Sequence, residues 1–202
     1  MLDLSKYQGI VFDMDGTLID SMGAHMRAWQ QACEAFGIPF DHDYMHGLGG
    51  VPTKKTAEIL NDKYQLNHSP EEVASRKRDF WIAMGESPAI IEETVNVLKH
   101  YRGKLKIGIG TGAERPHAEK MLQDTGLLDM VETLVTATDV THGKPHPETF
   151  LTVARNMGIE PQYCVVFEDT QIGAEAASRA GMDCILVQDG RINAQGFSRL
   201  PV

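Results

Sequence analysis

The chain has 202 residues, of which 42% are hydrophobic, and its formal net charge is −9. This length and composition are typical of one globular core, with or without a smaller inserted domain. Nucleic acids and anionic membranes bind through clustered Lys and Arg, so the acidic balance argues against both as partners. The N-terminus lacks a signal-peptide pattern and no run approaches about 18 apolar residues. We therefore expect a cytoplasmic protein.

The first element is a strand-like apolar run after Gln8, which ends at Asp13 and Asp15 and is followed by Gly16. Side chains alternate along a strand, so both carboxylates start on one side and converge on a small volume. Two like charges about 4 Å apart repel by roughly 4 kcal/mol at an effective dielectric near 20. The pattern therefore predicts a hard divalent cation with oxygen ligands.

The next segment changes to helical periodicity. Apolar residues recur at steps of four and three from Met22 to Phe36, and further helices are predicted over Thr53–Asn61 and Pro70–Met84. No strand-like run interrupts this block. We therefore expect residues 18–87 to form an inserted helical domain, with hinges at Thr17–Ser21 and Gly85–Ala89, and residues 1–17 and 88–202 to form the core.

From Ile90 onward, helices and strands alternate. The predicted helices are Ile91–Tyr101, Arg115–Asp124, Pro147–Met157 and Ile172–Ala180, and the predicted strands are Leu105–Gly110, Thr133–Ala137, Cys164–Phe167 and Asp183–Val187. Such alternation indicates an α/β fold with a doubly wound parallel sheet and helices on both faces. Residues 189–202 are polar and weakly patterned, and no role is assigned to them.

Polar residues follow the later strands as well. Thr111 and Gly112 follow the second strand-like run, Lys144 stands before Pro145 in a loop, and Glu168-Asp169 closes a third run. An open α/β sheet gathers such strand ends at one edge. We therefore expect these residues to meet Asp13 and Asp15 there.

The four motifs, in this order and spacing, resemble those of the haloacid dehalogenase-like phosphohydrolases over nearly the whole chain. The resemblance implies a Rossmann-like core with an inserted all-helical cap. It also implies catalysis in which Asp13 attacks phosphorus, Asp15 acts as acid and base, and Thr111 and Lys144 hold the transferring group.

The same resemblance implies a Mg2+ cofactor. Its ligands would be the side chain of Asp13, the backbone carbonyl of Asp15 and the side chain of Asp169. Glu168 would be either a further ligand or a residue that orients a ligand through water.

The inserted block resembles the cap of the β-phosphoglucomutase-type subgroup, with His25 and a substrate-selecting loop that contains Gly50, Thr53 and Lys54. The sugar mutases carry an arginine in this loop, and here the matching place holds Thr53. The Gly-x-Pro-Thr spelling is closer to bacterial fructose-1-phosphate phosphatases of this subgroup. For His25, substrate contact or proton positioning and a plain surface position both remain open.

These features lead to three hypotheses. The first is a phosphatase for a small phosphorylated sugar, such as fructose 1-phosphate. The second is a sugar-phosphate mutase of the β-phosphoglucomutase type, and the third is a non-catalytic phosphate-binding or interaction protein. We expect a monomer or a weak homodimer.

Other residues are given structural interpretations. The pairs His42/His46 and His142/His146 have four-residue spacing but lie near Gly or Pro, so we expect solvated loop histidines. Lys77, with its neighbours, is expected on a solvated helix face. Cys33, Cys164 and Cys184 form no Cys-x-x-Cys motif and are expected in the core.

Overall fold

The computed structural model describes residues 2–85 and 88–193. The α-helices are α1 (Met22–Phe36), α2 (His42–Gly47), α3 (Thr53–Tyr64), α4 (Pro70–Met84), α5 (Glu92–Tyr101), α6 (Arg115–Asp124), α7 (Glu148–Met157) and α8 (Gln171–Arg179). The strands are β1 (Gly9–Phe12), β2 (Lys106–Gly110), β3 (Thr133–Val135), β4 (Cys164–Glu168), β5 (Asp183–Gln188) and β6 (Arg191–Asn193). Short 3-10 helices lie at Leu128–Met130, Ala137–Asp139 and Pro161–Tyr163.

The strands form one sheet in the order β3-β2-β1-β4-β5-β6. The first five are parallel, as predicted, whereas β6 pairs antiparallel with β5. The turn between them is Asp189-Gly190, and both residues have positive φ, at 49° and 72°. Two consecutive residues with positive φ are typical of the tight type I′ turn of a β-hairpin. The tail, for which no role was predicted, therefore contributes an edge strand.

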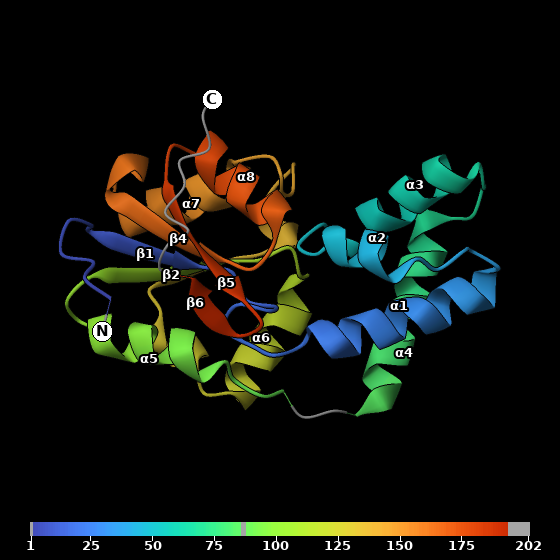
Figure 1. Ribbon diagram of the computed structural model, residues 1–202, viewed down its shortest axis with the longest axis horizontal. Coiled ribbons are helices and arrows are strands. Elements are labelled where there is room, and N and C mark those ends of the chain that lie inside the picture. Colours follow the sequence, from blue (N-terminus) through green and yellow to red (C-terminus); the bar gives the residue numbers. More distant parts are fainter. Residues whose placement is uncertain (1, 86–87, 194–202) are drawn as a thin grey trace.

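Helices cover both faces of this sheet, as expected from the alternating pattern (Figure 1). Because successive strand residues point to opposite faces, Ile10 and Phe12 pack with α5 and α6, whereas Val11 packs with α7 and α8. Phe12 and Phe167, on the paired strands β1 and β4, stack with ring centroids 4.9 Å apart. The α/β fold class is confirmed. The sheet thus fixes the carboxyl ends of β1, β2 and β4 side by side.

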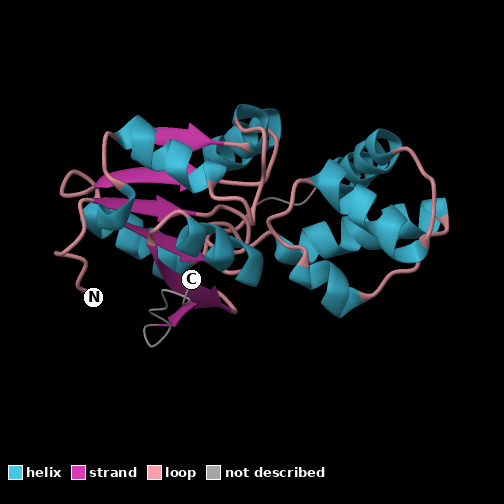
Figure 2. Ribbon diagram, turned by 90° about the horizontal axis from the view of Figure 1, so that it is seen from above, coloured by secondary structure: helices cyan, strands magenta, loops and turns pink. Residues whose placement is uncertain are grey.

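Helices α1 to α4 form a separate helical lobe beside these strand ends (Figure 2). This cap has its own core, in which Trp29, Met45 and Leu60 are buried together. The predicted loop around His42 and His46 is instead helix α2. The residue before it, Asp41, caps the helix, because its side chain accepts a hydrogen bond from the Tyr44 amide. The helical cap is therefore as expected, with one helix more.

The two connections between cap and core run side by side. The amide of Asp20 donates to Ala89 O, and the amide of Ile91 donates to Leu18 O, both at 2.9 Å. Of the predicted hinge Gly85–Ala89, residues 86–87 lie outside the described residues. The domain boundaries at 17/18 and 87/88 stay a prediction.

The three cysteines are free and buried, as expected. Within residues 2–85 and 88–193, the search for a helix long and apolar enough to cross a membrane finds none.

Candidate active site

The site is assembled where the parallel strands end. Asp13 directly follows β1, Thr111 directly follows β2, and Glu168 is the last residue of β4. Lys144 comes from the loop before α7 and reaches the same point. The structure therefore brings together the residues of all four sequence motifs.

A buried ion pair lies at the centre of the site. Nζ of Lys144 donates to Oδ1 of Asp13 at 2.6 Å and to Oε1 of Glu168 at 2.7 Å. The side chains of Lys144 and Glu168 are fully buried, and that of Asp13 is nearly so. Burial disfavours the ammonium charge, but the carboxylates of Asp13 and Glu168 more than offset it and raise the pKa of Lys144.

Three carboxylates face this one lysine. Asp13, Glu168 and Asp169 each place an oxygen within 4.8 Å of the others. Burial raises the pKa of Asp169, and the charges of Glu168 and Asp13 add to the effect. The donor set is all oxygen and carries excess negative charge, which suits a hard divalent cation such as Mg2+.

Gly16 leaves room beside this cluster. Its φ is +82°, and a Cβ added there would meet Oδ2 of Asp169 at 2.2 Å. Only glycine fits this left-handed turn at such a short distance from a carboxylate. The residues present therefore fit a bound cation, with Asp13 and Asp169 as the carboxylates that would hold it.

Glu168 has a different environment from Asp169. Its Oε1 accepts from Lys144, and its Oε2 accepts from both the amide and the hydroxyl of Thr170, each at 2.8 Å. Both oxygens thus have protein partners. Glu168 thus links Lys144 to Thr170, and its role at a metal stays a prediction.

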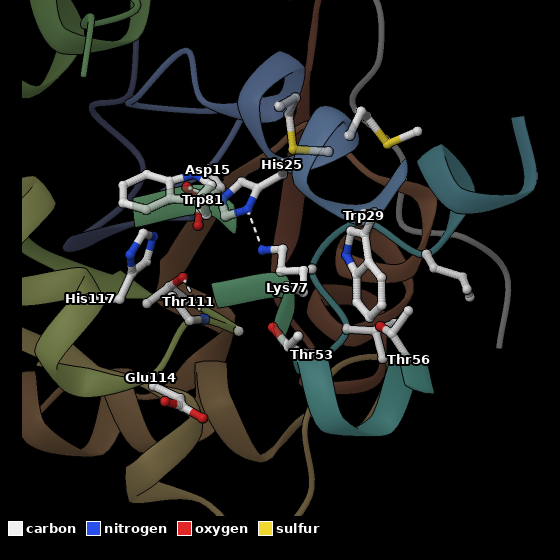
Figure 3. A pocket seen from close by; sticks show the side chains of 18 of the residues that line it. Asp15, His25, Trp29, Thr53, Thr56, Lys77, Trp81, Thr111, Glu114 and His117 are labelled. Atoms are coloured by element: carbon white, nitrogen blue, oxygen red, sulfur yellow. Dashed lines mark hydrogen bonds and ion pairs between the residues drawn. The ribbon is translucent and has the colours of Figure 1, made fainter. Parts of the chain in front are cut away.

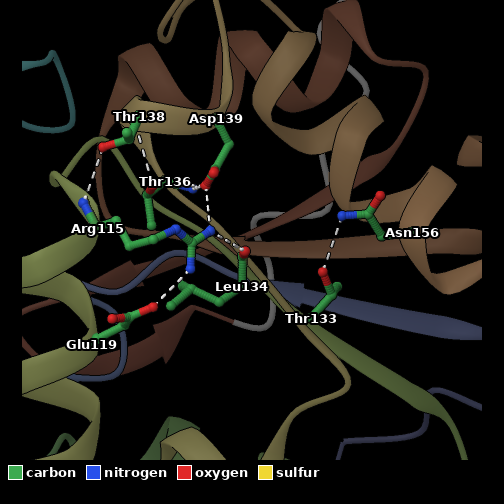
Figure 4. A network of polar contacts seen from close by, with 8 residues as sticks. All are labelled: Arg115, Glu119, Thr133, Leu134, Thr136, Thr138, Asp139 and Asn156. Carbon is green, nitrogen blue, oxygen red and sulfur yellow. Dashed lines mark hydrogen bonds and ion pairs between the residues drawn. The ribbon is translucent and has the colours of Figure 1, made fainter.

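A polar network around Arg115 joins the start of α6 to β3 and the segment that follows β3 (Figure 4). Arg115 at the start of α6 donates to Asp139 at 2.6 Å and to the carbonyl of Leu134 at 3.2 Å. The amide of Thr111 itself donates to Val135 O at 2.9 Å. These contacts hold the turn after β2 against the end of β3, so the Thr111 side chain keeps a defined position at the site.

Asp15 belongs to a second cluster that reaches into the cap. Its Oδ1 accepts from Ser21 Oγ at 2.5 Å and lies 3.2 Å from His25 Nε2. Nζ of Lys77 lies 2.7 Å from His25 Nδ1 (Figure 3). An ammonium only donates, so Nδ1 accepts and Nε2 carries the proton offered to Asp15.

The pKa of Asp15 follows from these contacts. Burial alone would raise it, but the hydrogen bonds from His25 and Ser21 lower the pKa of Asp15. His25, whose role was left open by the sequence, therefore lies at the site and orients Asp15.

A cavity of about 110 Å³ separates core from cap. Asp13, Asp15 and Thr111 line its floor, and Trp29 and Thr53 belong to its cap side. The volume is below the roughly 300–1,000 Å³ of small-molecule pockets. The cap thus lies close to the catalytic residues.

A cap loop rests directly on the core. A Cβ added to Gly112 would meet the carbonyl oxygen of Gly50 at 2.2 Å, and one added to Gly143 would meet Pro52 at 2.6 Å. Gly50 itself, at φ +81°, lies over the side chains of Lys144 and Thr170. Backbone therefore packs on backbone above the ion pair.

The predicted cap residues have different positions. Gly50 and Thr53 line the cavity with His25, Gly112 and Thr111. Lys54 does not line it, and its Nζ pairs with Glu71 at 2.5 Å on the exposed surface. The structure therefore does not bring Lys54 to the site.

Sequence reasoning missed several cavity residues on α4 and α6. Lys77, expected on a solvated face, is 6% exposed and points to His25. Trp81 and His117 meet edge to face at 4.4 Å between ring centroids, and Arg78 pairs with Glu114 across the two lobes. Burial lowers the pKa of His117 to about 4. Lys77, Trp81 and Met84 follow one another at steps of four and three, so they lie near one face of α4. This spacing was the signal in the sequence that Lys77 shares a face with apolar residues.

We predict that Lys77→Met removes a pH dependence of stability. Burial lowers the pKa of Lys77 to about 8 from 10.5, so between these values the unfolded chain binds more protons and wild-type stability rises with pH. The free energy of unfolding of the variant minus that of the wild type should fall by roughly 2 kcal/mol from pH 7 to pH 10. Urea unfolding at both pH values measures this. A difference that does not change with pH would contradict it, and exposed Lys55→Met is the control.

Comparison with known proteins gives consistent matches. The chain is 36% identical over 183 residues to fructose-1-phosphate phosphatase YqaB of Escherichia coli (strain K12), covering 91% of this chain and 97% of that protein. It is 27% identical over 191 residues to β-phosphoglucomutase of Bacillus subtilis (strain 168), covering 91% and 84%. The crystal structure of a hydrolase from Pseudomonas syringae superimposes with a TM-score of 0.83 at 25% identity, covering 91% and 85%.

The family model of the haloacid dehalogenase-like hydrolases matches residues 10–187. This range begins in β1, ends in β5 and contains every strand end that forms the site. The chain therefore belongs to the haloacid dehalogenase-like hydrolase family.

Proposed function

We propose that the protein is a magnesium-dependent phosphatase that hydrolyses a small phosphorylated sugar, with fructose 1-phosphate as the first candidate. One observation carries the proposal. Asp13 is held by Lys144 at 2.6 Å, with Asp15 on the same floor of a cavity that the cap covers. A nucleophile beside a separately held acid is what phosphate-ester cleavage needs, and simple phosphate binding needs neither.

In the first step, a carboxylate oxygen of Asp13 forms a bond to phosphorus while the bond from phosphorus to the sugar oxygen breaks. Lys144 and Thr111 hold the transferring phosphoryl group. We assign protonation of the leaving oxygen to Oδ2 of Asp15, because Oδ1 already accepts from Ser21 and interacts with His25. An arriving phosphate dianion raises the pKa of Asp15 by adding negative charge, which favours the protonated acid.

In the second step, Asp15 accepts a proton from water, and the water oxygen attacks phosphorus. The bond between Asp13 and phosphorus then breaks, so the carboxylate and inorganic phosphate are both released. Magnesium, when bound by Asp13, Asp169 and the Asp15 backbone carbonyl, supplies positive charge that offsets the phosphate oxygens. Glu168 keeps Lys144 oriented throughout.

The substrate class is supported by the cap and by a relative. The cavity wall combines apolar and aromatic surface with Thr53 and Thr56, which can hydrogen-bond a small polyol. YqaB, 36% identical over nearly all of both chains, is named a fructose-1-phosphate phosphatase. We extend that activity to this chain as the leading candidate.

A mutase is the second candidate, because a cap cation lines the cavity. One such cation is Arg78, which lines the cavity and pairs with Glu114 at 3.3 Å. If released, its guanidinium would match a second phosphate, whereas Lys54 and Lys55 are exposed and paired with Glu71 and Glu58. Binding of a second phosphate by Arg78 would need that ion pair between the lobes to open, which favours hydrolysis.

The decisive experiment follows two products together. With magnesium, we expect phosphate release from fructose 1-phosphate, and no glucose 6-phosphate from β-glucose 1-phosphate plus a trace of the 1,6-bisphosphate. Asp13→Asn, which is nearly isosteric, should fold and show no turnover. Glucose 6-phosphate forming faster than phosphate would establish the mutase instead. A wild type that binds sugar phosphates but turns over none would favour the non-catalytic hypothesis.

Metal removal gives a separate prediction. Thorough chelation should stop phosphate release, because Asp13, Asp169 and a phosphate dianion repel one another without a cation. Added Mg2+ should restore activity, and Ca2+ should support little, because its coordination is looser. Phosphate release that continues at the same rate in chelator would rule out the magnesium requirement.

The contact between the cap loop and the core gives a third prediction. Gly112→Ala should lower kcat/KM at least tenfold with little loss of stability, because its methyl group collides with Gly50 O and keeps the cap from closing. Gly47→Ala is the matched control, since a Cβ there meets nothing within 4 Å. Steady-state kinetics and thermal unfolding of both variants test this. Equal activity of the two variants would show that this contact is not needed.

A further inference from the structure

A cluster of metal-binding side chains lies on the outside of the loop that carries Lys144. His142, His146 and Glu148 each place one ligand atom within 4.8 Å of the others. The histidine side chains are 62% and 50% exposed, as expected for loop histidines, but they converge on one carboxylate. The proposed phosphatase mechanism uses none of the three.

The spacing of these atoms suits a small metal ion. His142 Nδ1 lies 3.0 Å from Glu148 Oε2, and His146 Nδ1 lies 3.9 Å from the same oxygen. Ligands about 2.0–2.1 Å from zinc in a tetrahedral arrangement lie about 3.3–3.4 Å apart, between these two values. The imidazole rings lie with centroids 4.7 Å apart, so shifts of a few tenths of an ångström would complete a facing set.

Glu148 is oriented before any ion arrives. Its Oε1 accepts from the amide of Thr141 at 2.9 Å, and its Oε2 accepts from the amide of His142 at 3.0 Å. The backbone contact from Thr141 is the main cause that lowers the pKa of Glu148, so the carboxylate is ionised. The carboxylate is thus fixed at the centre of the cluster.

The two histidine rings differ in the hydrogen bond made by Nδ1. The amide of Glu148 donates to His146 Nδ1 at 3.3 Å, so this nitrogen carries a lone pair. Nδ1 of His142 donates to the Glu148 carboxylate and would release that proton on binding a metal. The contact at His146 is long, and exchanging it for a metal–nitrogen bond would need little movement. One carboxylate and two imidazoles thus offer three ligand atoms to one point.

We propose that His142, His146 and Glu148 bind one divalent transition metal ion of the zinc class, with water in the remaining position. Imidazole nitrogen favours Zn2+, Ni2+ or Cu2+ over Mg2+, whereas the all-oxygen set at Asp13 and Asp169 favours Mg2+. The two sites therefore select different metals. This inference does not depend on the proposed phosphatase activity.

The other histidine pair of the same spacing is a built-in comparison. His42 and His46 lie on α2 with ring centroids 6.4 Å apart, and Asp43 lies 3.5 Å from His42 Nδ1 with a fully exposed side chain. Across the described parts of the chain, this pair does not gather a third ligand atom as His142 and His146 do. Spacing in the sequence is equal, but the distance between the rings and the position of the carboxylate differ.

An ion at His142, His146 and Glu148 would join the two ends of the loop whose middle carries Lys144. Residues 142 and 148 are six positions apart in the sequence and are already linked through the Glu148 carboxylate. A bound metal would add a bond from His146 inside this turn. The proposed ion is thus a clamp on the outer side of the catalytic lysine loop.

The test is zinc titration of the full chain in excess Mg2+, which keeps the acidic site filled. Calorimetry should give one Zn2+ per chain, and NMR of histidine-labelled protein should show shifts of the His142 and His146 imidazoles. His142→Ala and His146→Ala should each weaken zinc binding at least tenfold. His46→Ala and Asp13→Asn should bind as the wild type does.

Three results would contradict the proposed zinc site. Zinc affinity that is unchanged in both His142→Ala and His146→Ala would refute the site. Binding lost in Asp13→Asn would place the zinc at the acidic cluster, and loss in His46→Ala would place it on α2. Circular dichroism of each variant shows whether it is folded. Both loop histidines are at least half exposed, so replacing them should change stability little.

Discussion

The architecture of the site depends on one buried cation. Lys144 lies out of water between Asp13 and Glu168, and each of these carboxylates comes from the end of a different parallel strand. Burying a lone ammonium or carboxylate costs several kcal/mol, and mutual pairing offsets much of that. The loop before α7 and the ends of β1 and β4 must therefore meet. Thr170 completes the arrangement by satisfying the remaining oxygen of Glu168.

This pairing of one lysine with neighbouring carboxylates leaves excess negative charge at the site, on which the proposed chemistry depends. Asp169 lies in the same cluster and accepts a hydrogen bond of 3.2 Å from the Thr17 hydroxyl. Asp15, two residues from Asp13 in the sequence, lies outside this cluster of carboxylates and is held by Ser21 and His25. Two aspartates close in the sequence thus have different environments, since Asp13 pairs with Lys144 and Asp15 is held by Ser21 and His25.

Much of the core was predictable because its signals are local. Apolar runs that end in Asp, Thr-Gly or Glu-Asp, separated by amphipathic helices, fix both the sheet and the edge where those residues gather. The edge strand β6 was missed, although Asp189-Gly190 between strand-like residues is a hairpin signal. The cap was harder to predict. Whether Lys77 is solvated or buried depends on how α4 docks against α1 and the core, and helix periodicity alone does not encode docking. Lys54 and Lys77 look alike in the sequence, yet one pairs with Glu71 at the surface and the other reaches His25.

The backbone contact between Gly50 and Gly112 has a consequence for selectivity. Asp15 contacts His25, which in turn contacts Lys77, and both of these residues belong to the cap. In the proposed phosphatase, the acid would therefore be placed correctly only when cap and core come together. Since glycine meets glycine above the ion pair, no side chain there can yield to a bulky substrate. An alcohol part too large for the cavity would hold the lobes apart and leave the acid misplaced, even with its phosphate bound. Closure of the cap on the core would then select substrates by size, as in enzymes that discriminate by induced fit.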